Sequence, residues 1–72
     1  MTNPYENLAN AIIQRAAKDY MQALKQLKRF PRDKIAIAQK KDLEQFFHSG
    51  WFQILTDVDS DYLIQRMQAV VA

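Results

Sequence analysis

The sequence has few of the residues that cross-link a small protein or form its tight turns. Its 72 residues include no cysteine, one glycine and two prolines. The lack of cysteine excludes disulfides and thiolate zinc sites, and the scarcity of glycine and proline leaves little turn chemistry for β-hairpins. A single domain of this length has a small core, so its stability requires tight helix packing, a partner or self-association.

Long apolar runs are missing as well. No stretch approaches the roughly 20 apolar residues that a membrane-spanning helix needs. Residues 1–6 have neither the basic start nor the apolar segment of a signal peptide. We therefore expect a soluble, cytoplasmic protein without a membrane partner.

The residues that are present predict helices. Asn3 and Pro4 are typical of a helix start, Pro31 stops that helix, and Asp33 is suited to cap the next one. We predict a single all-α domain over residues 1–72. It consists of a long helical hairpin (4–29 and 33–48), a short helix (50–55) and a C-terminal helix (60–71) that packs back on the hairpin.

The stretch Phe46–Leu55 holds the only tryptophan, the only glycine and the only histidine. Within it, Ser49-Gly50 has two interpretations. Either Gly50 ends the preceding helix as its C′ residue, or Ser49 caps a new helix that begins at Gly50. The helical spacing of the apolar residues from Trp51 to Leu55 favours the second interpretation.

One helical face of this stretch is predicted to lie in the core, and it holds Phe46, Phe47, Trp51 and Ile54. Phe52 and Leu55 point away from that face. Either the last helix covers them, which is the default for large apolar side chains, or they form an exposed patch that binds a partner. The candidate partner-binding residues are therefore Phe52, Leu55 and Trp51, whose polar tip suits the margin of such a patch.

The same periodicity predicts inward-facing residues elsewhere. In the first helix these are Tyr5, Ala9, Ile12, Ile13, Ala16, Tyr20, Ala23, Leu24 and Leu27; in the second, Ile35, Ala36 and Leu43; in the last, Tyr62, Leu63, Met67 and Val70.

The net charge of +2 is unevenly distributed. Residues 1–32 carry six basic and two acidic side chains, residues 33–50 are balanced, and residues 51–72 carry one basic and three acidic side chains. A basic helix face can follow nucleic-acid phosphates, although Asp19 and Asp33 flank this one and no aromatic residue interleaves it. The candidate nucleic-acid-binding residues are Arg15, Lys18, Lys25, Lys28, Arg29 and Arg32.

No catalytic or metal motif is complete. The run Asp57–Asp61 resembles half of a calcium loop, but Tyr62 and Gln68 replace its required glycine and glutamate. These carboxylates are predicted to cap the last helix instead. His48 and Ser49 point apart on a helix and have no third catalytic partner. We therefore predict a protein that is not an enzyme and has no metal, cofactor or small-molecule substrate.

Two segments together resemble a known group of proteins. They are Phe46-Phe47-x-Ser49-x-Trp51-Phe52-x-x-Leu55-Thr56-Asp57-Val58-Asp59, followed by Tyr62-Leu63-Ile64, and Ala17-Lys18-Asp19-Tyr20-x-x-Ala23-Leu24-x-x-Leu27. Over roughly residues 12–66 the chain is similar to small all-helical proteins encoded on prophages and conjugative elements of Gram-positive bacteria. It departs from them at Gly50, where an acidic residue is frequent, and at Ser60, where a glycine is frequent. The resemblance implies a genomic context and no particular activity.

The leading hypothesis is a small non-catalytic accessory protein of a phage or mobile element. It acts by binding another protein or a second copy of itself. The alternative is an accessory protein that binds nucleic acid through the basic face of the first helix.

Overall fold

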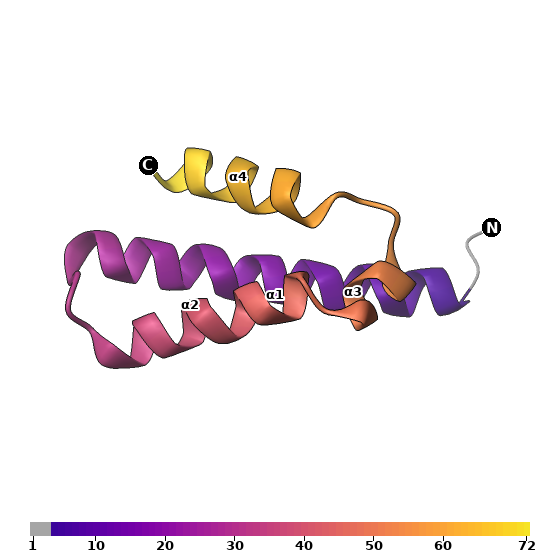
Figure 1. Ribbon diagram of the computed structural model, residues 1–72, viewed down its shortest axis with the longest axis horizontal. Coiled ribbons are helices and arrows are strands. Elements are labelled where there is room, and N and C mark those ends of the chain that lie inside the picture. The colour runs from indigo at the N-terminus through magenta and orange to yellow at the C-terminus, as the bar shows by residue number, and fades with distance from the viewer. Residues whose placement is uncertain (1–3) are drawn as a thin grey trace.

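Over the residues that the structure describes, the protein is an all-α fold of four helices, as the sequence predicts (Figure 1). The computed structural model describes residues 4–72, with side chains from Ala9 onward. The predicted cap Asn3 and the side chain of Tyr5 lie outside the described residues. The helices are α1 (Pro4–Arg29), α2 (Lys34–Phe47), α3 (Gly50–Leu55) and α4 (Ser60–Val71).

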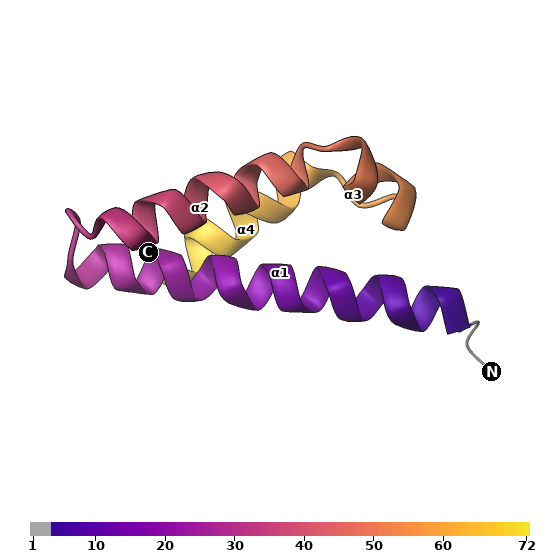
Figure 2. The same cartoon turned by 90° about the horizontal axis from the view of Figure 1, so that it is seen from below.

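The long α1 is the element against which the other three helices pack. The helices α1 and α2 form the predicted hairpin, and α3 continues from the end of α2 along the N-terminal half of α1 (Figure 1). The chain then turns back, and α4 runs along one side of the hairpin towards the α1–α2 turn. Figure 2 views the opposite side of the hairpin, with α4 behind it. The resulting molecule is elongated, with extents of 43 × 21 × 19 Å.

The helices α2 and α4 begin where the sequence predicts, and each start is capped by hydrogen bonds from backbone amides to an aspartate side chain. The Asp33 side chain accepts hydrogen bonds from the backbone amides of Ile35 and Ala36. The Asp59 side chain accepts them in the same way from the amides of Asp61 and Tyr62. Such caps each contribute about 1 kcal/mol, and they confirm that an aspartate of the acidic run serves helix capping.

The break at Ser49-Gly50 follows the second of the two interpretations. Ser49 is extended, with φ −79° and ψ 161°, and α3 begins at Gly50. Gly50 does not have positive φ, so it is not the left-handed residue of a helix C-terminus. The Ser49 hydroxyl makes no cap bond and instead donates to the carbonyl of Phe46 at 2.6 Å. A Cβ at Gly50 would meet no atom within 4 Å, so the turn does not require glycine.

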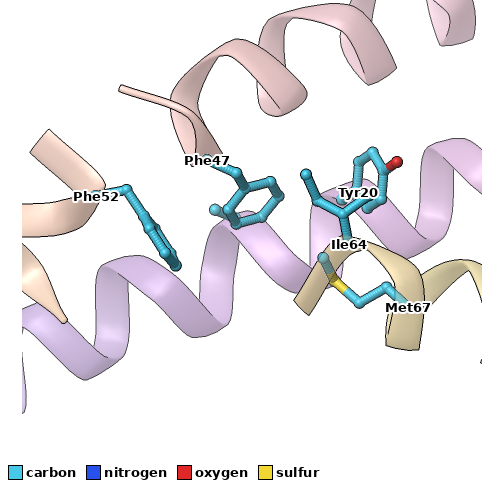
Figure 3. Close-up of a cluster of buried hydrophobic side chains, with 6 residues drawn as sticks. Tyr20, Phe47, Phe52, Ile64 and Met67 are labelled. Carbon is cyan, nitrogen blue, oxygen red and sulfur yellow. The ribbon is translucent and has the colours of Figure 1, made fainter. Parts of the chain in front are cut away.

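The core is an aromatic cluster that lies between all four helices. Tyr20, Phe47 and Phe52 are fully buried, and Phe47 lies between Phe52 on one side and Tyr20 and Ile64 on the other (Figure 3). The Phe47 ring meets Tyr20 and Phe52 edge to face, with centroids 5.7 and 5.5 Å apart. This geometry is the one that aromatic quadrupoles favour. In the described part of the chain, the other buried residues are Ile64 and Met67 of α4 and three small alanines, Ala16, Ala23 and Ala36, which let the helices approach.

The predicted face of α3 is wrong. Trp51 and Ile54 are 70% and 78% exposed, whereas Phe52 is completely buried. The prediction placed residues 46–55 on helix faces as if they formed one uninterrupted helix. The extended backbone of Ser49 interrupts that phase, so the Phe52 face of α3 turns inward. Phe52 is therefore a core residue and no contact for a partner, and Leu55 is only half-buried.

Other predicted inward residues are also exposed. Ile35 of α2 is 81% exposed, and Tyr62 and Val70 of α4 are 61% and 63% exposed. On α4 the buried pair is Ile64 and Met67, because the helix packs through a narrower stripe than its apolar content suggests. On α1, Ala16, Tyr20 and Ala23 are buried as predicted.

Truncating Phe52 and truncating its neighbour Trp51 should have very different effects on the stability of the fold. Phe52→Ala removes a fully buried ring and should lower the free energy of unfolding by about 3–5 kcal/mol. Trp51→Ala removes an exposed ring and should change it by about 0.5 kcal/mol or less. Urea unfolding followed by circular dichroism measures both; equal losses would contradict the orientation of α3.

Candidate interaction surfaces

A chain of hydrogen bonds joins α4, α1 and α2 through the buried Tyr20. The Tyr20 hydroxyl donates to Glu44 Oε2 at 2.7 Å and accepts from the Gln68 amide at 3.1 Å. Lys40 Nζ donates to the same carboxylate oxygen at 2.8 Å. We name Gln68, Tyr20, Glu44 and Lys40 the tyrosine chain. It satisfies the one polar atom of the fully buried aromatic cluster, as burial of a hydroxyl requires.

The tyrosine chain shifts two pKa values in opposite directions. Burial, together with the hydrogen bond to Glu44, raises the pKa of Tyr20 to about 12. Partial burial alone would raise the pKa of Glu44, but the hydrogen bonds from Lys40 and Tyr20 outweigh it and lower that pKa. Neutral tyrosine and ionised glutamate are thus the stable pair, and the arrangement is structural.

A second polar contact ties the end of α2 to the start of α4. His48 Nε2 lies 2.8 Å from Asp61 Oδ1, and both side chains are exposed. The hydrogen bond to Asp61 raises the pKa of His48. Ser49 bonds to the Phe46 carbonyl instead, so His48 and Ser49 form no nucleophile–base pair.

The predicted basic face of α1 is exposed along its whole length. At about 100° per residue, four of its residues fall within an arc of about 80°; these are Arg15, Lys18, Lys25 and Arg29, here called the basic stripe. Arg15 pairs with Asp19 at 3.5 Å. Exposed pairs of this kind contribute little, so the stripe keeps its positive character.

The other two predicted cations stand apart from the basic stripe. Lys28 faces α4, where its Nζ donates to the carbonyl of Val71 at 3.1 Å. Arg32 lies in the α1–α2 turn and is exposed. Arg29 lies over the Phe30 ring, 5.8 Å from its centroid, so one aromatic residue does accompany the C-terminal end of the stripe.

The α3 surface consists of Trp51 and Ile54. Both side chains project from a helix whose opposite side is anchored by the buried Phe52. Trp51 lies about 200° around α3 from Gln53, which borders a hollow with the α3–α4 loop. Trp51 therefore points to the side of α3 away from that loop.

The hairpin groove is a third exposed surface, formed by α1 and α2. It has a volume of 530 Å³ and is lined mainly by apolar side chains. Its lining residues are Ala11, Ile12, Arg15, Ala16, Asp19, Leu43 and Phe46. Across Leu43 it continues into a hollow on α2 whose lining includes Ile35, Ala38 and Asp42. These lining residues belong to α1 and α2, whereas the Tyr20 hydroxyl bonds to Gln68 of α4. The groove is therefore assigned to the side of the hairpin opposite α4, the helix that Figure 2 shows behind α1 and α2.

Sequence reasoning missed Ile54, Ile12 and Ile35 as surface residues because it assigned all three to the core. The positions of these residues around the helix axis could have indicated their exposure. The residues of α2 predicted to face inward spread over about 120° of the helix, and Ile35 lies at one edge of that arc; they are Ile35, Ala36, Leu43, Phe46 and Phe47. A residue at the edge of such an arc can remain exposed.

Among the described residues, no group of three or more His, Cys, Asp or Glu side chains is placed to hold a metal ion. None of the four helices, as far as they are described, combines the length and the apolar character needed to cross a membrane. Comparison of the chain with protein-family models, curated proteins and solved structures gave no match.

The tyrosine chain leads to a testable alkaline transition. Because the pKa of Tyr20 rises from 10.0 to about 12 on folding, its contribution to stability is complete below pH 10 and is lost as the pH rises through 12. Absorbance titration of tyrosinate should include a step near that raised value, from Tyr20. Tyr20→Phe should abolish this late step and cost about 1 kcal/mol at neutral pH, whereas the exposed control Tyr62→Phe should retain the step. A late step that persists in Tyr20→Phe would contradict the assignment.

The contact between His48 and Asp61 leads to a second test. His48 is the only histidine, so one imidazole signal in NMR reports its pKa. That pKa should lie above 6.5 and fall towards this value in Asp61→Asn, while Asp57→Asn serves as the exposed control. Since the folded pKa is raised, the associated stabilisation is present below pH 6.5 and disappears as the pH rises through the folded value. An unchanged titration in Asp61→Asn would refute the pairing.

Proposed function

We propose that the protein is a small non-catalytic accessory protein that acts by binding another protein through the α3 surface. The observation that carries the proposal is the exposure of Trp51 and Ile54 on a helix anchored by buried Phe52. Tryptophan is enriched among the residues that dominate binding energies, and a pre-ordered apolar pair loses little entropy on binding. The expected partner presents an apolar pocket large enough for an indole.

The proposal retains Trp51 from the sequence-based set and replaces Phe52 by Ile54. Trp51 and Ile54 are three residues apart, so they lie on adjoining parts of one helix face. The half-buried Leu55 follows Trp51 by four residues and so lies beside it on the helix. A partner would cover this face without disturbing the aromatic cluster beneath it.

The genomic context is also a proposal. The resemblance in residues 17–27 and 46–64 supports an origin on a prophage or conjugative element, and hence the cytoplasm of a bacterial host. Many small proteins of such elements act by occupying the surface of a host or phage protein, which is an argument by analogy.

A second candidate function is nucleic-acid binding by the basic stripe. The observation that favours it is the common exposed arc of Arg15, Lys18, Lys25 and Arg29. Such binding weakens steeply with salt as counterions are released. Elution from a DNA column at low salt, without salt-dependent affinity, would exclude it.

The principal test compares variants of the α3 surface with a matched control on α4. The tagged chain is recovered from the bacterium that encodes it, and its partner is then purified and its Kd measured. Trp51→Ala and Ile54→Ala should each weaken binding by about 2 kcal/mol, roughly 30-fold in Kd. Tyr62→Ala, which truncates a comparably exposed side chain, should leave the Kd unchanged. Equal affinity in all three variants, with circular dichroism showing intact folds, would overturn the proposal.

A further inference from the structure

We infer that the hairpin groove is the site at which two copies of this chain pair. This inference goes beyond the proposed function, because it concerns a different surface and a different partner. The groove is lined by residues of α1 and α2, and α4 lies behind this hairpin in the view of Figure 2. Its apolar lining comes from both helices, chiefly Ile12 of α1 and Leu43 and Phe46 of α2.

The shape of the groove suits helices. It is bounded by two helices joined as a hairpin, and small residues such as Ala11 and Ala16 on its α1 side let another backbone approach. A second hairpin laid across it completes a four-helix arrangement, in which each apolar stripe faces another. The exposed Ile35, on the continuation of the groove along α2, would then be covered too.

The amount of exposed surface favours a large occupant. The chain exposes 5693 Å² at a mass of 8.4 kDa, whereas a compact monomer of that mass exposes about 4,600 Å². The excess of about 1,000 Å² is comparable to the roughly 800 Å² that each partner contributes to a stable interface. The molecule is elongated, with extents of 43 × 21 × 19 Å, so it has more surface for its mass than a compact one.

The need for stability favours the same occupant. Among the described residues the buried core contains eight side chains, three of which are alanines. The chain has no cysteine and therefore no disulfide to supplement this core. Small scaffolds of this kind commonly gain the missing burial by oligomerisation. A second copy is the one partner that is present wherever the chain itself is made.

The charges at the edge of the groove permit self-pairing. The α1 edge carries Arg15 and Asp19, and the α2 hollow is bordered by Lys34 and Asp42. Each helix thus offers one cation and one anion. A two-fold axis brings the same surface of both copies together, and a balanced surface does not repel its own copy. The other three residues of the basic stripe, Lys18, Lys25 and Arg29, do not line the groove.

Sedimentation velocity over a concentration series tests the inference. The chain should sediment as a species of twice 8.4 kDa at higher concentrations and dissociate on dilution. Ile12→Glu and Ile35→Glu place a charge on the α1 and α2 sides of the groove, and each should weaken pairing about tenfold or more. Ile35→Glu adds a negative charge in the first turn of α2, where the helix dipole favours it, so this variant should keep the fold.

Val70→Glu is the matched control, because Val70 is a large apolar residue on the outer face of α4 with 63% exposure. It should sediment like the unaltered chain. NMR amide signals around the groove should shift with concentration, while those of Tyr62 and Val70 should stay constant. A chain that remains monomeric at every concentration, or a dimer that survives both groove variants, would overturn the inference. The result is independent of Trp51→Ala, which alters the α3 surface alone.

Discussion

Burial of the Tyr20 side chain is the constraint on which the rest of the structure depends. The ring sits at the meeting point of α1, α2 and α4 and is fully buried, yet it carries a hydroxyl that must remain hydrogen-bonded. Glu44 from α2 and Gln68 from α4 supply those bonds. The two partners lie 24 and 48 residues from Tyr20 in sequence, so the same contact that satisfies the hydroxyl also sets where both helices lie along α1.

This arrangement divides the surface of the molecule among distinct roles. The side of the hairpin that faces α4 holds the tyrosine chain and the aromatic cluster. The opposite side holds the hairpin groove, the basic stripe borders it on α1, and the α3 surface lies at the end of α2. Because α4 is short and covers one side of the hairpin, the apolar residues on the other side stay exposed. The proposals for a protein partner and for self-pairing both follow from this uneven coverage.

Much of the fold was predictable from the sequence, and the reason is local. Helix starts depend on hydrogen bonds between a side chain and amides two or three residues away, as at Asp33 and Asp59. Accordingly, α2 and α4 begin directly after their predicted caps, and the observed bounds of all four helices lie within one residue of the predicted ones. The candidate site was less predictable. The basic residues are exposed as expected, but Phe52 is buried and Ile54 exposed, the reverse of the predicted arrangement.

The sequence by itself determined that this protein is a set of four helices with a basic first helix and no covalent staple. Those properties depend on residue type and short-range hydrogen bonding. Tertiary structure alone decided which face of each helix is buried. A single extended residue, Ser49, breaks the helical phase before α3, and its effect on the orientation of Phe52 depends on where α1 lies. The placement of Ile12 and Ile35 at an open groove likewise depends on which side of the hairpin α4 covers, and that choice is set by contacts between residues far apart in the chain.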